Sequence, residues 1–208
     1  MPLSWNRKKR RVHAVKLEPE KRQFLPLFDF FRRDMEKLKL YYIDDEYIRF
    51  LQKQDAHVMN NKNRSRPYVG VVLFVNGYQY FVPLESPKPN HANIKNGKHI
   101  LRIEGGRYGL MGFNNMIPVP TGALAPIDIS RVPDRGYADL LRRQATFCNR
   151  NRDSIHGHAS GTYNDVVSGR NKFLARICCD FKTLEEACDR YEPTQGRAGM
   201  GRERSCHE

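Results

Sequence analysis

Residues 68–84 read YVGVVLFVNGYQYFVPL, in which Asn76-Gly77 separates two runs rich in β-branched and aromatic residues. Such runs are typical of strands. Asn-Gly between them predicts a β-hairpin with a type I′ turn, because both central residues of that turn need a positive φ. The first run is apolar at nearly every position, so we expect it in the centre of a sheet with another layer packed over it.

Shorter elements are expected on both sides of this hairpin. A strand over Leu38–Ile43 should lead into a short helix that ends near Gln54, because Asp44-Asp45-Glu46 places acidic residues at a helix N-terminus. The polar stretch from Asp55 to Arg66 has no period and is expected to be a loop. Further strands are expected at His99–Ile103, Leu110–Val119 and Leu124–Ser130. Between the first two, Gly105-Gly106 fits a hairpin turn better than a phosphate-binding loop.

Helical patterning begins after Pro133-Asp134. Apolar residues at positions 137, 140, 141, 145 and 148 form one stripe of a first helix. A second helix is expected over Tyr163–Phe173, and a third from Thr183, whose hydroxyl and Glu186 fit a capping box. The predicted fold class is therefore α+β, with a twisted, mostly antiparallel sheet and flanking helices that are mainly C-terminal.

Composition limits the classes of partner and compartment. The 208 residues carry a net charge of +13 and 39% hydrophobic residues, which indicates a protein with a real core and a polyanionic partner. No run of 18 apolar residues is present, so no membrane partner is expected. Five cysteines without a C-x-x-C pair, and no export signal, favour a reducing cytoplasm.

Charge also divides the chain into three parts. Residues 1–34 hold ten basic and four acidic residues, including Arg7-Lys8-Lys9-Arg10-Arg11. This extension fits a disordered arm better than a nucleic-acid or nuclear-import patch, because like charges repel. Regular patterning begins at Met35, which makes Met35 a possible true start. We expect a folded domain over residues 35–192 and a flexible, Gly- and Arg-rich tail over residues 193–208.

Common catalytic motifs are absent. No P-loop, G-x-G-x-x-G, H-E-x-x-H or G-x-S-x-G element occurs. His156-Gly-His158 is a weak candidate for a metal site, because no carboxylate or cysteine stands at ligand spacing beside it. We therefore expect neither a cofactor nor a metal.

The segment Ser86-Pro87-Lys88-Pro89 follows the hairpin directly. A proline forces the preceding residue into extended backbone, so Ser86 and Lys88 should both be extended. Residues two apart in an extended chain face the same side. A hydroxyl and an ammonium held together in this way can bind a phosphate. The alternative is an ordinary proline-rich turn with a solvated lysine.

Several motifs in register carry a resemblance to a known family. These motifs are Arg66-Pro-Tyr-Val-Gly-Val71, the Asn-Gly hairpin, Pro83-Leu84 with Ser86-Pro-Lys88 and His91, and Asn114-Asn-Met-Ile-Pro-Val119. Together they are similar to the endoribonuclease toxins of type III toxin–antitoxin systems, the ToxN/AbiQ family. The resemblance runs from about Lys39 to about Tyr191. It implies a barrel-like sheet and metal-independent RNA cleavage to 2′,3′-cyclic phosphate and 5′-hydroxyl ends. It also implies inhibition by a repetitive pseudoknot antitoxin RNA in a closed ring, and phage defence by abortive infection.

The resemblance also assigns site residues. It implies that Ser86, Lys88 and Arg66 are catalytic, with Glu85, His91, Tyr68, Asn114 and Asn115 near the active site. Glu85 stands where some relatives have a small hydroxyl residue, and Arg66 stands where some have lysine, which keeps the charge but removes a plausible proton donor. A lysine near its ordinary pKa of about 10.4 is charged and stabilises phosphate charge, and it acts as a base only if desolvation lowers that pKa. The sequence does not assign the group that takes the 2′ proton.

Basic residues elsewhere make a phosphate-binding groove credible. The predicted RNA-binding residues are Lys95, Lys98, Arg102, Arg107, Arg142, Arg143, Arg150 and Arg152. Two alternatives stay open. One is a noncatalytic basic RNA-binding protein, although no RRM, KH or zinc-knuckle motif is present. The other is a nuclease that uses His91 and His99 as base and acid.

Overall fold

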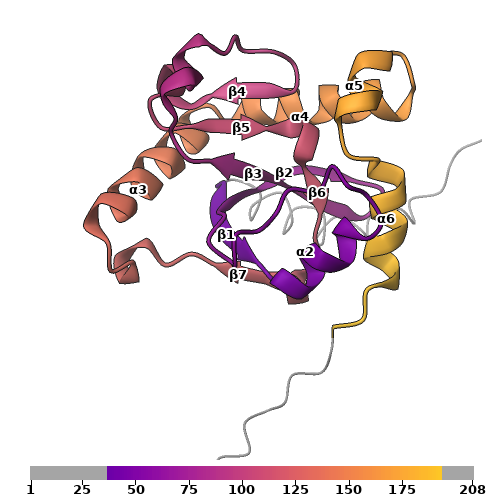
Figure 1. Ribbon diagram of the computed structural model, residues 1–208, viewed down its shortest axis with the longest axis horizontal. Coiled ribbons are helices and arrows are strands. Elements are labelled where there is room, and N and C mark those ends of the chain that lie inside the picture. The colour runs from indigo at the N-terminus through magenta and orange to yellow at the C-terminus, as the bar shows by residue number, and fades with distance from the viewer. Residues whose placement is uncertain (1–36, 194–208) are drawn as a thin grey trace, which may run out of the picture. The chain divides into compact units, whose positions relative to one another are not determined.

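The computed structural model describes residues 37–193. The predictions for residues 1–34, for Met35 as a start and for the tail from residue 194 lie outside the described residues. Within the described part, seven strands form one sheet in the order β4-β5-β3-β2-β1-β7, with β6 also paired to β3 (Figure 1). They are β1 (Lys39–Ile43), β2 (Tyr68–Val75), β3 (Tyr78–Glu85), β4 (Ile100–Arg102), β5 (Leu110–Gly112), β6 (Ile117–Pro118) and β7 (Leu124–Pro126).

The pairings confirm the predicted antiparallel sheet. All six strand pairs recorded between residues 37 and 193 are antiparallel. The strands at the two ends of the order, β4 and β7, pair with one neighbour each in this part of the chain, so the sheet is open rather than closed into a barrel.

The hairpin has the predicted turn. Asn76 and Gly77 have φ of 51° and 88°, and Val75 pairs with Tyr78 across the turn. Both residues are therefore in the left-handed region that a type I′ turn requires. β2 lies between β1 and β3, as its apolar sequence predicted.

Five α-helices are described: α2 (Asp45–Gln52), α3 (Arg135–Arg150), α4 (Arg152–Val167), α5 (Lys172–Ile177) and α6 (Phe181–Arg190). Figure 1 shows α3 and α6 at opposite sides of the sheet, with α4 behind it. The predicted layer over β2 is α4, whose His156 Nδ1 lies 2.7 Å from the carbonyl oxygen of Val72. None of the helices in the described part has the length and apolar character that a membrane span needs.

Two helix predictions were wrong in their limits. The expected helix over Tyr163–Phe173 is broken, because Gly169 has φ +66° after α4 ends and the side chain of Asn171 accepts a hydrogen bond from Leu174 N to begin α5. The third helix begins at Phe181 rather than Thr183. Its cap is Asp180, whose carboxylate accepts a hydrogen bond from Thr183 N at 3.1 Å.

Two predicted strands are shorter than expected. Residues 110–119 form β5 and β6 with a 3₁₀ turn at Phe113–Asn115 between them, because the two strands pair with different parts of β3. Residues 124–130 form only β7, since the carboxylate of Asp128 accepts a hydrogen bond from Ser130 N and starts another 3₁₀ turn. The strand expected over residues 99–103 is β4, and Gly105-Gly106 lies in the β4–β5 connection, as predicted.

A buried carboxylate ties β3 to the C-terminal helices. Glu185 of α6 is only 4% exposed. Its Oε1 accepts hydrogen bonds from the hydroxyls of Tyr80 at 2.8 Å and Tyr163 at 2.7 Å. Its Oε2 accepts one from Lys182 Nζ at 2.7 Å. Satisfied networks of this kind fix one arrangement of a core, so β3 provides a firm base for the segment that follows it.

Candidate active site

The Ser86–Lys88 segment directly follows the end of β3. Lys88 has φ −135° and ψ 150°, as expected for a residue before proline. A 3₁₀ turn over Pro89–Asn93 follows, in which His91 N donates to Lys88 O at 3.0 Å. Ser86 and Lys88 are both exposed. The hydroxyl and the ammonium are therefore open to a ligand on a segment whose backbone is constrained.

The Lys88 ammonium has one acidic neighbour among the described residues. Its Nζ lies 3.3 Å from Glu85 Oε2, and the two side chains are 58% and 27% exposed. Exposed pairs of this type contribute only about 0–1 kcal/mol. A phosphate therefore competes readily with Glu85 for the ammonium.

The β4–β5 loop packs closely against this segment at two glycines. Gly109 has φ +99°, and a Cβ there would lie 1.9 Å from the carbonyl oxygen of Glu85. Gly106 has φ +97°, and a Cβ there would lie 2.8 Å from the carbonyl group of His91. Only glycine fits such close approaches with a positive φ. The loop thus packs against the segment near both of its ends, a contact that the sequence analysis did not find.

Arg66 binds the backbone at the end of β3, where the Ser86–Lys88 segment begins. Its guanidinium is buried, with Nε donating to Asn60 O at 2.8 Å and Nη1 donating to Leu84 O at 3.4 Å. A guanidinium has five N–H groups, so these bonds leave three that no other described residue occupies. The guanidinium of the predicted catalytic arginine therefore contacts the end of β3 at Leu84, two residues before Ser86 in the chain, and two of its N–H groups bind the backbone there and at Asn60.

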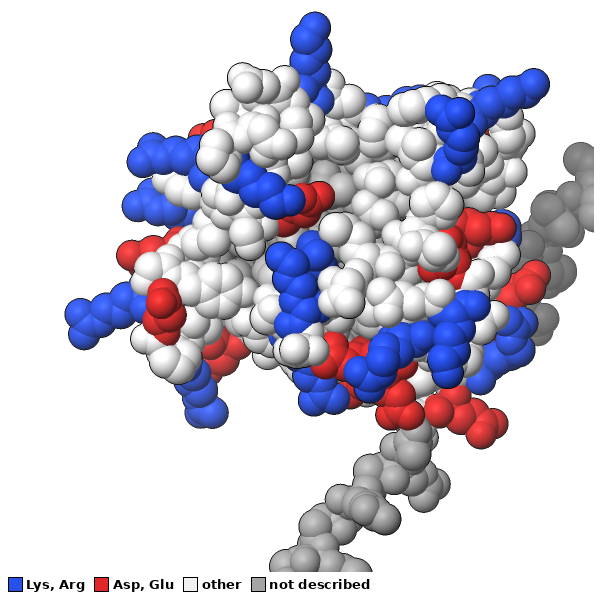
Figure 2. Space-filling view, in the orientation of Figure 1, with Lys and Arg blue, Asp and Glu red and all other residues white. Residues whose placement is uncertain are grey.

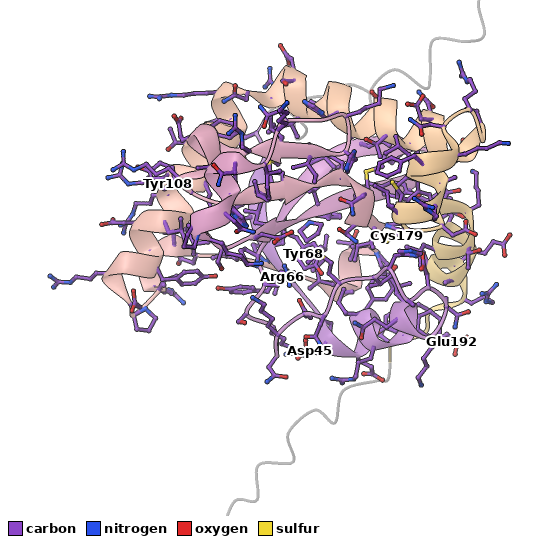
Figure 3. The ribbon with its side chains drawn as sticks, turned by 45° about the horizontal axis from the view of Figure 1, so that its top comes forward. Asp45, Arg66, Tyr68, Tyr108, Cys179 and Glu192 are labelled. Atoms are coloured by element: carbon purple, nitrogen blue, oxygen red, sulfur yellow. The ribbon has the colours of Figure 1, made fainter. Side chains whose placement is uncertain are left out.

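Tyr68 lies beside Arg66 near the middle of the view in Figure 3. Burial raises the pKa of the Tyr68 phenol above its ordinary value, and this effect outweighs the charge of Arg66, which lowers it. The phenol therefore stays protonated at neutral pH and is a hydrogen-bond donor rather than a base.

His91 and His99 have separate surroundings. His91 is 2% exposed, and its Nδ1 has no hydrogen-bond partner among residues 37–193. The His99 ring lies 6.0 Å from the ring of Phe173 in α5, and desolvation lowers the His99 pKa. No hydrogen bond or ring contact joins the two imidazoles in the described part, so the geometry does not favour them as an acid–base pair.

Asn114 and Asn115 connect the sheet to neighbouring loops. Asn115 Nδ2 donates to His57 O at 2.9 Å, and Asn114 O accepts from Cys179 N at 2.8 Å. Asn114 Nδ2 also points to Ile177 O at 3.5 Å. These amides hold the 55–58 loop and the α5–α6 connection against the turn between β5 and β6.

The structure brings together four of the eight predicted RNA-binding residues. Arg107, Arg142, Arg143 and Arg150 line one cavity between the β4–β5 loop and α3. Lys98 is paired with Asp165 of α4 at 2.5 Å, and Arg102 binds Asn96 and the carbonyl of Ala92. Lys95 is exposed, whereas Arg152 lies 3.7 Å from Asp153.

Basic charge is not confined to one patch. Figure 2 shows Lys and Arg projecting from several sides of the visible face, with acidic side chains mostly over its lower half. A nucleic-acid site must therefore be argued from particular residues rather than from the net charge.

The weak metal candidate has another explanation. His156 and His158 lie in α4, and their Nδ1 atoms contact the carbonyl oxygens of Val72 and Lys98 at 2.7 and 2.9 Å. Among residues 37–193, no three His, Cys, Asp or Glu side chains gather as metal ligands. Burial raises the pKa of Cys148 and Cys178 to about 12, so neither thiol is a nucleophile at neutral pH.

Comparison with known proteins identifies the family of the chain. Residues 39–189 match the family model for toxin ToxN of type III toxin–antitoxin systems. The chain is 37% identical over 163 residues to Endoribonuclease ToxN of Bacillus thuringiensis subsp. kurstaki, covering 74% of this chain and 84% of the relative. It is 28% identical over 165 residues to Endoribonuclease AbiQ of Lactococcus lactis subsp. lactis, covering 74% of this chain and 89% of the relative.

Solved structures are similar as well. One is the structure of a type III toxin–antitoxin system in which a non-coding RNA pseudoknot selectively inhibits the toxin. Its TM-score is 0.66, and it is 35% identical over 74% of this chain and 96% of that chain. Another is AbiQ, described as a lactococcal anti-phage endoribonuclease, with a TM-score of 0.65 and 27% identity over 74% of this chain and 96% of that chain. The chain belongs to the ToxN family of type III toxin–antitoxin toxins.

Proposed function

We propose that this chain is an endoribonuclease that cleaves RNA without a metal, by attack of a 2′-hydroxyl on the adjacent phosphodiester. The 2′-oxygen loses its proton and bonds to phosphorus, the bond to the 5′-oxygen breaks, and that oxygen takes up a proton. The products are a 2′,3′-cyclic phosphate and a 5′-hydroxyl. Negative charge grows on the non-bridging oxygens during this step, and groups placed to stabilise it accelerate the reaction.

Three residues have stated roles in this proposal. Lys88 stabilises the developing charge, Arg66 adds positive charge from the end of β3, and Ser86 orients the phosphate through its hydroxyl or backbone N–H. The observation that carries the proposal is the exposed, extended Lys88 beside Ser86, paired only weakly with Glu85. Names of the relatives support the choice of RNA as substrate.

The proposal includes an inhibitor and a setting. We infer that a repetitive antitoxin RNA with pseudoknots binds the toxin and forms a closed ring with it in the cytoplasm. Release of the toxin would then stop phage growth by abortive infection. The pseudoknot inhibition and the anti-phage activity described for solved relatives support this extension. Short tandem repeats followed by a terminator, immediately upstream of the gene, are the expected sign of such an antitoxin.

The test is to incubate the purified full chain with a defined transcript in EDTA and to map the new ends. We expect cleavage with 2′,3′-cyclic phosphate and 5′-hydroxyl ends. RNA binding without any new ends would instead identify a noncatalytic RNA-binding protein. Loss of cleavage in EDTA, restored by Mg²⁺, would contradict the metal-independent mechanism.

Replacing Glu85 by glutamine should strengthen substrate binding. The Glu85→Gln change removes the carboxylate that competes with phosphate for Lys88, so we expect the KM for RNA at low salt to fall roughly two- to fivefold. Glu186→Gln is a control, because Glu186 is an exposed carboxylate 3.9 Å from Arg190 on α6. A fall in kcat of about a hundredfold at constant KM would instead identify Glu85 as a proton acceptor.

A further inference from the structure

A cavity of about 500 Å³ lies between the β4–β5 loop and α3. This volume is within the range of about 300–1,000 Å³ that is typical of small-molecule sites. Its lining includes the aromatic rings of Tyr108 and Phe147, together with the four arginines named above. The cavity therefore combines flat apolar surfaces with positive charge.

Tyr108 lines this cavity and is in contact with two of its arginines. The guanidinium carbons of Arg107 and Arg143 each lie 5.3 Å from the centre of its ring. Its backbone is fixed to α3 by Gln144, a buried residue whose Nε2 donates to Tyr108 O at 2.9 Å. The ring is thus a positioned aromatic platform with two cations against it.

Positive charge in the cavity exceeds the acidic charge beside it. Arg142 is paired with the exposed Asp139 at 2.5 Å. Arg107, Arg143 and Arg150 have no ion pair with any acidic side chain among residues 37–193, and Glu104 is the one acidic residue of the described lining. Like charges gathered in this way repel one another, and a bound anion relieves the repulsion.

The cavity adjoins the candidate active site along the chain. Tyr108 directly precedes Gly109, whose backbone packs on Glu85 and whose Cβ would lie 3.4 Å from the carbonyl carbon of Ser86. Figure 3 shows Tyr108 at the side of the view beside α3, whereas Arg66 and Tyr68 lie near the middle. The residue that follows Tyr108 therefore contacts the backbone at the start of the Ser86–Lys88 segment.

We propose that this cavity, resting on the proposed ribonuclease function, binds an unpaired nucleotide that flanks the scissile phosphate. The base stacks on the Tyr108 ring in place of a guanidinium, and Arg107 and Arg143 turn to bind the adjoining phosphates. Stacking on aromatic side chains and arginine planes is the usual way in which proteins hold single-stranded RNA bases. The cavity then contributes to the choice of cleavage position, whereas Lys88 carries the chemistry.

The experiment compares the full-length chain with its Tyr108→Leu, Arg143→Gln double variant. On a transcript with mapped cut sites, we expect KM to rise roughly five- to a hundredfold with a smaller change in kcat, and the base preference beside the cut to weaken. Binding of a single-stranded RNA oligonucleotide should weaken similarly in a Lys88→Ala background, with a shallower salt dependence. Arg131→Gln, at an exposed arginine of the Ile129–Arg131 turn, is the control and should change neither the KM nor the affinity for the oligonucleotide.

A conservative variant separates stacking from a folding defect. Tyr108→Phe keeps the ring and should retain the wild-type KM, whereas Tyr108→Leu alone should not. Unchanged KM, cut pattern and oligonucleotide affinity in the double variant would overturn this proposal while leaving the ribonuclease proposal intact. If the wild-type chain bound RNA but produced no cuts, the ribonuclease proposal would fail, and with it the assignment of this cavity as a subsite for cleavage.

Discussion

Lys88→Ala should reduce kcat for RNA cleavage by about 10²–10³-fold, the typical cost of removing one group that stabilises charge in a transition state. The side chain is exposed and weakly paired, so its loss leaves no buried charge behind and should not change the melting temperature. Single-turnover cleavage of a defined transcript measures the effect. Growth arrest on expression of the full chain should disappear in the same variant.

Lys88→Arg distinguishes the role of the charge. Arginine keeps a cation at position 88, so part of the rate should remain if Lys88 acts electrostatically. A Lys88→Arg variant as inactive as Lys88→Ala would assign proton transfer to Lys88 instead. Lys172→Ala, at an exposed lysine of α5, is the matched control and should cleave at the wild-type rate.

Gly109→Ala should damage both stability and activity. The new Cβ would lie 1.9 Å from Glu85 O, at a residue with φ +99°, so the loop and the Ser86–Lys88 segment must move apart. We expect a loss of at least about 2 kcal/mol in the free energy of unfolding, equivalent to a melting temperature lower by about 4–8 °C. A displacement of about 1 Å at the segment would reduce cleavage about 10²-fold.

Gly105→Ala provides the matched control for this effect. Gly105 is in the same loop and has φ +65°, but a Cβ there would have nothing within 4 Å. The Gly105→Ala variant should therefore lose only about 1–2 kcal/mol in the free energy of unfolding, from the strain of the left-handed backbone, and its cleavage rate should stay nearly unchanged. Equal loss of cleavage in both variants would mean that the close contact at Gly109 does not position the segment.

Local signals made much of the fold predictable. The Asn76-Gly77 turn was found because a type I′ turn restricts which residues fit, and the extended Lys88 was found because proline restricts the residue before it. The same kind of reasoning misplaced the start of α6. Asp180 and Thr183 are both good caps, and in the structure Asp180 caps the helix while Phe181, its first residue, is completely buried in the core.

Features that depend on long-range packing were not predicted. Sequence alone listed Arg107 and Arg143 as basic residues, but their meeting over Tyr108 requires α3 to pack on the β4–β5 loop. Lys98 and Arg102 were expected to contact RNA, yet both have partners in the fold, which no local pattern reveals. Glycines at 106 and 109 were the available signal for close packing, and only Gly105-Gly106 was interpreted, as a turn.

A single 2′-deoxy substitution tests the mechanism most directly. A transcript cut once by the full chain is prepared with a 2′-deoxynucleotide immediately before the scissile bond, and both RNAs are incubated with the wild-type chain in EDTA. The unmodified RNA should be cut and the substituted one should stay intact at that bond, because the attacking oxygen is missing. Cleavage of the substituted bond, or a requirement for Mg²⁺ with the natural RNA, would contradict metal-free attack by the 2′-hydroxyl.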